Sequence, residues 1–364
     1  MGNLTYTEYK AHKTDWFCQA GWGIFTHYLF HDENWDKKVA SFDTERLADK
    51  LASIGAKYYF ITLMQRKKYM LAPNETYDRI TGYKSGEACA TRDLVEDLYQ
   101  SLSKRGIALC LYYTGDGPLD DPQAGPRMGY VSQDDKVTKE YVEKWSSVLR
   151  EYSLRYGNKI KAWWIDGCYQ FIGYEEETLS MMAEAARAGN PDALVSLNCG
   201  VNDRVSSYTQ HEDFTTGEMN DFSDVPDSRF VGGEQWHTLT HLGSTWGGRD
   251  CQIDGPSLAD YIHRVNQKGG VVTIDIGINE EGDLMDEQLK VLRHIRFGEP
   301  GEEETGEKNA DEKNENDEQR KALFFQQKEL LDTFLSKHAI SQAQYDKSYG
   351  DLVVKMGAEK WLKE

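Results

Sequence analysis

The sequence has no long hydrophobic run and a clear deficit of positive charge. No apolar stretch approaches the about 20 residues that a membrane-spanning helix needs. Residues 1–6 also lack the basic-then-apolar pattern that begins a signal peptide. Lys and Arg number 42 against 61 Asp and Glu, which gives a net charge of −19. A field of that sign repels phosphate backbones and anionic lipid, so we expect neither a nucleic-acid nor a membrane partner.

Cysteine is sparse and scattered, with six residues and no CxxC pair. Several of the six lie inside apolar, strand-like runs. We therefore expect buried free thiols rather than disulfides or a metal site, and a cytoplasmic protein, because thiols persist in reducing compartments. The cysteines are Cys18, Cys89, Cys110, Cys168, Cys199 and Cys251.

Aromatic residues, in contrast, are plentiful, with nine Trp and 21 Tyr among 364 residues. The apolar face of a sugar ring stacks well on indole and phenol rings, so this enrichment is compatible with a carbohydrate site. It is equally compatible with a large core. The length allows one large domain of roughly 250–300 residues and an appendage.

Short apolar runs alternate with amphipathic helical stretches over residues 1–297. Most of the runs are apolar on both faces and rich in β-branched or aromatic residues, which is typical of parallel strands covered by helices. The alternation predicts an α/β fold of the TIM-like (β/α)8 barrel type. We expect its second half to be irregular, because residues 223–255 are rich in loop-forming residues. The strand candidates are 22–30, 57–64, 107–115, 161–168, 193–200, 211–219, 228–236 and 270–278. The helix candidates are 44–54, 91–103, 138–156, 175–188, 257–267 and 286–295.

The composition changes sharply after residue 297. Residues 298–322 are almost wholly Glu, Asp, Lys, Asn and Gly, so they cannot bury enough apolar surface to offset the entropy of ordering, and we predict an acidic flexible linker. Residues 323–364 regain a helical period, with Ser341 as a candidate N-cap between two helices. The predicted domains are therefore a catalytic barrel over 1–297, the linker, and a C-terminal helical hairpin. We expect the hairpin to dock on the barrel or to self-associate.

Barrel enzymes carry their catalytic groups at the C-terminal ends of the strands, so polar residues that end apolar runs are the first candidates. The clearest case is Asp166, which follows Trp163, Trp164 and Ile165 and precedes Gly167. A glycine at that place lets the backbone turn away from the strand. The carboxyl group could also cap the next helix or pair with a buried arginine.

A series of motifs between residues 16 and 295 resembles glycoside hydrolase family 29, the α-L-fucosidases. The motifs occur in the family's order and at sensible spacing, and the resemblance implies its barrel fold. They are WFCQAGWGIFTH at 16–27, AKYYFIT at 56–62, TRDLV at 91–95 with LYY at 111–113, WIDG at 164–167, STWG at 244–247 and KGGVVTIDIG at 268–277.

The resemblance implies a retaining glycosidase that acts on an oligosaccharide or glycoconjugate without a metal or cofactor. Asp166 would be the nucleophile, and a second carboxyl group would be the acid/base. Glu218, in a TTGE sequence that resembles the family's T-P-E turn, is the first candidate for the acid/base, with Glu234 and Glu212 as alternatives. Such a pair needs opposed environments, an ionised nucleophile and an acid whose pKa is raised. The substrate-binding candidates are His27, Gln65, Arg66, Tyr113, Trp164, Asn198, Trp236 and Trp246.

The sequence departs from the family pattern at three places. Gln65 and Arg66 stand where the family has a histidine pair that contacts fucose hydroxyls. Trp236 is followed by His237 instead of a glutamate, and the linker and hairpin stand in place of a C-terminal β-sandwich. If Arg66 reaches the pocket, its guanidinium would favour an anionic sugar; otherwise residues 65–68 form a solvated loop.

These departures leave other functions open. One alternative is a carbohydrate-binding relative that has lost catalysis, and another is a glycosidase for a different, anionic sugar. A barrel enzyme of unrelated chemistry is the third. His237 and His241 have the spacing of a metal pair but lack the glutamate of the H-E-x-x-H motif.

Overall fold

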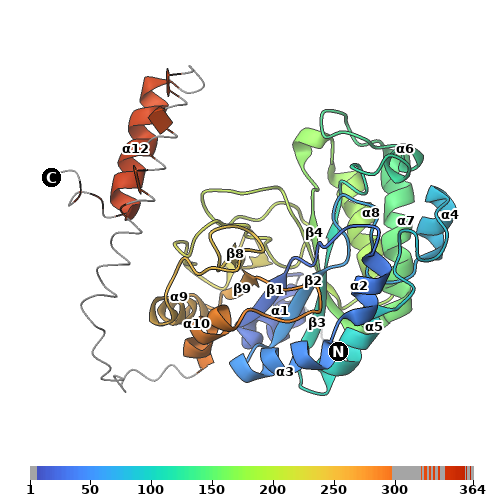
Figure 1. The fold of residues 1–364 in the computed structure, drawn as a ribbon, viewed down its shortest axis with the longest axis horizontal. Helices are drawn as coiled ribbons and strands as arrows, with labels where there is room; N and C mark the ends of the chain where they lie inside the picture. The colour runs from blue at the N-terminus through green and yellow to red at the C-terminus, as the bar shows by residue number, and fades with distance from the viewer. Residues whose placement is uncertain are drawn as a thin grey trace. The chain divides into compact units, whose positions relative to one another are not determined.

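Seven parallel strands form one strongly curved sheet in the computed structural model of the protein (Figure 1). Neighbouring strands follow the order β5-β4-β3-β2-β1-β9-β8. The structure describes residues 6–296 and, beyond them, Ser341, helix α12 and separate positions between 321 and 361. The sheet strands are β1 (Trp22–Thr26), β2 (Tyr58–Thr62), β3 (Ala108–Thr114), β4 (Ile160–Asp166), β5 (Leu194–Leu197), β8 (His237–His241) and β9 (Val271–Ile276).

An irregular segment, residues 213–219, lies between β5 and β8 and takes the place of a regular strand. At one edge the Asp213 amide donates to the Val195 carbonyl of β5 over 2.7 Å. At the other edge, Glu218 and Leu239 of β8 form an isolated parallel bridge. The sheet is therefore an irregular (β/α) barrel, as the sequence predicts.

Amphipathic helices cover the outside of this sheet, and all six predicted helices are present within a few residues of the predicted ends. In α3, Leu47, Leu51 and Ile54 are fully buried, and the Asp43 side chain caps the first turn by accepting from the Arg46 amide. The helices are α1 (Tyr6–Ala20), α2 (Trp35–Ser41), α3 (Thr44–Ile54), α4 (Glu75–Thr81), α5 (Leu94–Ser103), α6 (Ala124–Met128), α7 (Lys139–Tyr156), α8 (Glu176–Arg187), α9 (Gly255–Gln267) and α10 (Asp286–Arg296), with short 3-10 turns η1 (Gly157–Lys159) and η2 (Gln170–Ile172).

Helix α1 closes the N-terminal end of the barrel, and the sequence reasoning missed it. Residues 16–20, which begin the fucosidase-like motif at 16–27, form the last part of this helix. The Phe17 ring is fully buried and packs against Tyr58, Phe214 and His237, with ring centroids 5.0–5.3 Å apart. The helix thus places the Phe17 ring at the N-terminal end of the barrel interior. A site is expected at the other end, where the strands have their C-termini.

The seventh predicted strand, 228–236, was wrong. That region forms a short antiparallel pair, β6 (Phe230–Val231) and β7 (Glu234–Gln235), and the barrel strand is the next segment, β8. Strand β8 reads HTLTH and is polar, yet all of it is buried. His237 bonds to the Thr215 carbonyl and the Thr273 hydroxyl, 2.8 and 2.7 Å away. An apolar pattern cannot reveal a strand whose polar groups pair inside the barrel.

The chain divides into two compact units, Met1–Gly298 and Glu299–Glu364. The predicted linker, 298–322, lies outside the described residues except for position 321. In the second unit, α12 (Gln342–Met356) begins directly after Ser341, and Phe324, Leu352 and Trp361 are buried together. Self-association of the predicted hairpin stays a prediction. In the described part of the chain, no helix is both long and apolar enough to cross a bilayer.

Candidate active site

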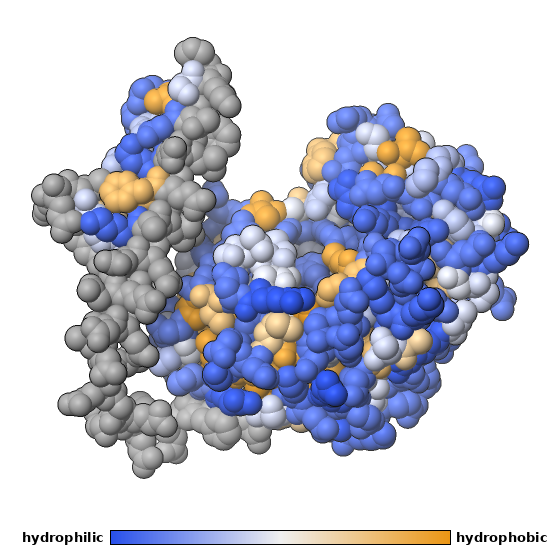
Figure 2. All heavy atoms as spheres, in the orientation of Figure 1, coloured by the Kyte–Doolittle hydropathy of each residue, from blue (hydrophilic) through white to orange (hydrophobic). Residues whose placement is uncertain are grey.

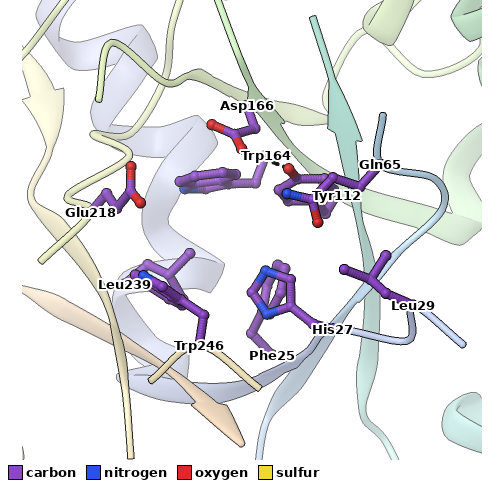
Figure 3. Close-up of a pocket in the computed structure, with 10 residues that line it drawn as sticks. All are labelled: Phe25, His27, Leu29, Gln65, Tyr112, Trp164, Asp166, Glu218, Leu239 and Trp246. Atoms are coloured by element: carbon purple, nitrogen blue, oxygen red, sulfur yellow. Dashed lines mark hydrogen bonds between the residues drawn. The ribbon is translucent and has the colours of Figure 1, made fainter. Parts of the chain in front are cut away.

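A cavity of about 290 Å³ opens at the C-terminal ends of the strands (Figure 3). This volume is near the lower end of the range for small-molecule pockets, so it suits a small ligand. Figure 3 shows Asp166 and Glu218 around Trp164, with His27 and Trp246 on the opposite wall. The lining residues are Phe25, His27, Leu29, Gln65, Tyr112, Trp164, Asp166, Glu218, Leu239 and Trp246.

Asp166 is the last residue of β4, and four donors hold its carboxylate. Tyr112 donates to Oδ2 over 2.6 Å. The Gly167 amide, the Tyr169 hydroxyl and the Asn198 side chain donate to Oδ1 over 2.8, 3.0 and 2.8 Å. Donors of this kind stabilise a carboxylate in its charged form and fix its orientation. Asp166 therefore has the environment of an anionic nucleophile.

Glu218 has the opposite environment. Burial and, to a lesser extent, the nearby charge of Asp166 raise the pKa of Glu218 to about 7, against the opposing effects of the Asn198 bond and His27. A carboxyl group with such a pKa is partly protonated at neutral pH, as a general acid must be. The turn that presents it needs Gly217, which has φ +56°; a Cβ there would lie 2.0 Å from the His237 carbonyl oxygen.

Asn198 joins the two carboxyl groups. Its Nδ2 donates to Asp166 Oδ1 over 2.8 Å and to Glu218 Oε2 over 2.7 Å. Because both bonds start at one nitrogen, the two oxygens cannot lie farther apart than the sum of these lengths. That limit falls within the about 5–5.5 Å separation of retaining glycosidases and below the about 6.5–9.5 Å of inverting ones.

The remaining walls combine aromatic faces with two polar groups. The Tyr112 and Trp164 rings stack at 5.5 Å with an 18° interplanar angle. The His27 ring is held by Asp275, whose Oδ1 lies 2.9 Å from its Nδ1. Gln65 Oε1 is buried and has no hydrogen-bond partner among the residues that the structure describes. A sugar hydroxyl could donate to this oxygen, while the aromatic faces suit the apolar side of a sugar ring.

The family model for alpha-L-fucosidases matches residues 29–297, which is most of the chain. The chain belongs to the alpha-L-fucosidase family. No curated protein sequence matches it.

Solved structures of related enzymes share the fold at low sequence identity. An endo-fucoidan hydrolase of glycoside hydrolase family 107 superposes with a TM-score of 0.63 and 14% identity, over 79% of this chain and 92% of that one. Alpha-L-fucosidase isoenzyme 1 from Paenibacillus thiaminolyticus gives 0.59 and 17%, over 79% and 75%. A family 29 alpha-L-fucosidase from Bacteroides thetaiotaomicron, described as a trapped covalent intermediate with 2-fluoro-fucosyl fluoride, gives 0.58 and 16%, over 78% and 73%.

Five of the predicted binding residues meet at the cavity of this fucosidase-family chain. His27, Gln65, Trp164 and Trp246 line it, and Asn198 bonds to both of its carboxyl groups. In the described residues, no three His, Cys, Asp or Glu side chains are grouped as metal ligands would be.

Two predicted aromatic residues lie elsewhere. Tyr113 points out of the barrel, stacks on Trp145 and bonds to its carbonyl. Its neighbour Tyr112 lines the cavity instead, because successive side chains of a strand point to opposite faces. Trp236 is buried just before β8, at the other end of the barrel, close to Gly270.

The alternative acids, Glu212 and Glu234, do not line the cavity. Lys10 of α1 donates to the Glu212 carbonyl and to Glu234 Oε1, both over 2.7 Å. The Glu212 carboxyl group instead accepts from the Tyr208 amide over 2.7 Å, and the Glu234 carboxyl group pairs with Lys10. Of the three candidates, Glu218 alone faces Asp166.

Arg66 does not line the cavity. Its guanidinium bonds to both Asp120 oxygens over 3.0 and 3.2 Å, and its Nη1 lies 3.8 Å from Asp116 Oδ2. Among the described residues it is the single non-glycine with a positive φ, 57°. With its charge paired in this way, Arg66 gives no support to an anionic substrate group in the cavity.

The sequence reasoning missed Tyr112, Tyr169 and Asp275. The first was available from strand alternation, since Tyr112 pairs in register with Trp164 and therefore shares its face. Asp275 lies in the last strand, within the family-like KGGVVTIDIG motif, which the sequence analysis used only for the family resemblance. Tyr169 lies in a loop, and its role depends on the path of that loop, which no sequence pattern specified.

Proposed function

We propose that this protein is a retaining glycoside hydrolase of the α-L-fucosidase type, which removes a terminal fucose or a related sugar from an oligosaccharide or glycoconjugate. The observation that supports it most is the pair of bonds from Asn198 to Asp166 and Glu218. These two bonds limit the two carboxyl groups to a separation suited to retention. The two groups also have opposed environments, as a nucleophile and an acid require. The two-carboxylate route does not use a metal ion.

In the first step, an Asp166 oxygen attacks the anomeric carbon of the sugar in the cavity. The bond between that carbon and the glycosidic oxygen breaks, and the Glu218 carboxyl group gives its proton to the departing oxygen. The products are a glycosyl ester on Asp166 and the released alcohol. The raised pKa of Glu218 makes that proton available near neutral pH.

In the second step, Glu218, now a carboxylate, takes a proton from water. The water oxygen attacks the anomeric carbon, and the ester bond to Asp166 breaks. Two inversions give net retention and restore both carboxyl groups. The route requires a covalent intermediate, and one of the similar structures is described as such an intermediate of a fucosidase.

Azide rescue of two variants tests these roles. Asp166→Gly and Glu218→Ala should both lose hydrolysis of unactivated fucosides by about 10³-fold or more. With an activated aryl α-L-fucoside and azide, Glu218→Ala should form the α-fucosyl azide, because azide attacks the glycosyl ester. Asp166→Gly should form the β-azide, because azide then replaces the nucleophile.

Glu212→Gln is the matched control, since this carboxyl group does not line the cavity. It should retain wild-type turnover. The same anomer from both rescued variants, or unchanged turnover in Asp166→Gly, would contradict the proposed roles.

The carbohydrate-binding alternative makes a different forecast. Wild-type protein would bind fucosyl oligosaccharides, measured by calorimetry, but hydrolyse no member of an aryl-glycoside panel that includes anionic sugars. The intact pair of carboxyl groups favours turnover.

We also propose that the protein works in the cytoplasm. All six cysteines are free thiols, and Cys89, Cys110 and Cys168 are buried. Unpaired thiols of this kind are common in reducing compartments. Fractionation of cells that carry the native protein tests this, and recovery of the chain outside the cytoplasmic fraction would contradict it.

A further inference from the structure

A second cavity, of about 230 Å³, lies in the unit Met1–Gly298, and none of the described residues lines both it and the catalytic cavity. Its walls include Lys10 and Lys13 of α1, Arg187 at the end of α8, and residues 210–213. The chain has a net charge of −19, and the face of this unit that Figure 2 shows is largely hydrophilic. Two lysines and an arginine in one cavity are therefore a local gathering of positive charge in an acidic protein.

Two of these cations share a single carboxylate oxygen. Lys13 Nζ lies 3.0 Å from Asp213 Oδ2, and Arg187 Nη2 lies 2.6 Å from the same atom. The Lys13 side chain is only 5% exposed. Burial lowers the pKa of Lys13, the charge of Asp213 opposes this effect, and the charge of Arg187 adds to it. Two cations held beside one carboxylate in a buried place would be stabilised by a second negative charge.

Two polar atoms of the lining residues are buried without a hydrogen-bond partner among the described residues. They are Arg187 Nε and Glu212 Oε2. Glu212 is 1% exposed, and its other carboxyl oxygen accepts from the Tyr208 amide over 2.7 Å. An arginine Nε can only donate, and a protonated carboxyl group donates through its hydroxyl. Both groups therefore call for an acceptor, because a buried donor without one is costly.

We propose that this cavity binds a small carboxylate anion, which accepts hydrogen bonds from Arg187 and Glu212 and balances the charges of Lys13 and Arg187. Its two oxygens match the two unpartnered donors, and its single negative charge matches the cation that Asp213 alone does not balance. Guanidinium groups pair well with carboxylates, and the volume limits the ligand to a small molecule. The inference does not depend on the proposed function, because these residues do not line the catalytic cavity.

Glu212 makes this binding depend on pH. Its pKa of about 8 keeps it protonated at pH 7, as a donor, whereas at pH 9 it is a carboxylate that repels the ligand. Between pH 7 and 9 the Kd should therefore rise about tenfold. The charged or titratable groups around Glu212 are Lys10 and Lys13 of α1, Arg187 of α8, Glu234 of β7, and Cys199, Tyr208, His211 and Asp213 of the segment after β5.

Calorimetric titration of the full chain with sodium acetate, at constant ionic strength in sodium chloride, tests the site. Wild type should bind one acetate per chain. Arg187→Gln removes a donor and a charge, so its Kd at pH 7 should be at least about tenfold higher. Arg264→Gln is the matched control, because it removes an exposed arginine that pairs with Asp260 on α9. It should keep the wild-type Kd, as should Asp166→Asn in the catalytic cavity.

Glu212→Gln separates the role of Glu212 from that of Lys13, which also favours weaker binding at high pH. Its amide imitates the protonated carboxyl group, so it should bind acetate as wild type does at pH 7 and weaken at least threefold less than wild type at pH 9. This variant also decides the matter if Arg187→Gln does not fold, which thermal unfolding shows.

Four results would overturn the carboxylate site. They are no saturable binding of acetate by wild type, an unchanged Kd in a folded Arg187→Gln, a loss of binding in Asp166→Asn, and equal weakening of Glu212→Gln and wild type at pH 9. Inorganic phosphate is the remaining probe. If it binds to wild type at pH 7 more tightly than acetate, the assignment to a carboxylate is wrong.

Discussion

Asn198 donates from one side-chain nitrogen to both carboxyl groups of the cavity, so it affects both their spacing and the pKa of Glu218. Its bond to Glu218 lowers the pKa of that acid, while burial and the charge of Asp166 raise it to about 7. The pKa of Glu218 therefore results from opposing effects. The effect of Asn198 is the one that a substitution can remove while both carboxyl groups stay in place.

Replacing Asn198 by Ala should lower kcat/KM by up to about 100-fold, because both carboxyl groups lose a positioning contact. The alkaline limb of the kcat/KM profile, which falls near pH 7 in the wild type, should move to higher pH, because the bond that lowers the pKa of Glu218 is gone. A pH series of initial rates measures this shift.

Asn202→Ala, in the same loop, removes an exposed amide that bonds to the Gly200 carbonyl and should keep the wild-type profile. An alkaline limb that stays in place or moves to lower pH in Asn198→Ala would show that Glu218 is not the group that titrates.

The sequence predicted the two carboxyl residues of the site more accurately than the other residues that line the cavity. Asp166 follows an apolar run and Glu218 ends a strand-like run, and strand ends in a barrel converge on one face, so both positions could be predicted from the sequence. The choice of Glu218 over Glu212 and Glu234 depended on which of the three side chains lines the cavity. The sequence did not show this, because the polar residues of β8 bond inside the barrel and the strand has no apolar pattern.

At the scale of elements, α1 and the segment before residue 213 enclose a group of buried charged side chains, Lys10, Glu212 and Glu234. Burial, opposed by a bond from the Tyr208 amide and assisted by the charge of Glu234, raises the pKa of Glu212 to about 8. Lys10, only 4% exposed, bonds to Glu234. These buried surroundings therefore favour the protonated form of Glu212.

The free energy of unfolding should consequently fall with rising pH because of Glu212. Its folded pKa lies above its unfolded value, so the stabilisation is complete below about pH 4 and is lost as the pH rises through about 8. Glu212→Gln keeps the shape without the ionisation and should flatten this dependence, with a gain over wild type on the order of a few kcal/mol at pH 9. Denaturant unfolding between pH 5 and 9 measures it.

Glu184→Gln, an exposed carboxyl group on α8, should follow the wild-type curve. If Glu212→Gln instead loses stability in parallel with wild type as the pH rises, another group causes the pH dependence of the free energy of unfolding.

Elements with a strong helical period or an apolar strand pattern were predictable, and α3, α7 and β4 show this most clearly. Helix α1 and strand β8 were not. The buried face of α1 is a narrow aromatic stripe within a mostly polar helix, and β8 satisfies its histidines and threonines inside the barrel. In both cases tertiary contacts decide the structure, which local pattern cannot report.

At the scale of the whole molecule, every residue assigned to the site belongs to the unit Met1–Gly298. The family model also ends at residue 297. A chain ended after residue 297 should therefore fold and keep kcat/KM on an aryl fucoside within about twofold of the full chain. Thermal unfolding and initial rates check this. An insoluble or inactive truncated chain would show that the barrel depends on residues 299–364.

Covalent labelling at Asp166 tests the central claim most directly. Wild-type protein is incubated with 2-fluoro-fucosyl fluoride and digested, and the peptides are analysed by mass spectrometry, with Asp166→Asn as the parallel sample. The account predicts one fluorosugar on the peptide that contains Asp166 and none on the variant. A label on Glu218 or Asp116, or an unlabelled protein that still hydrolyses fucosides, would contradict it.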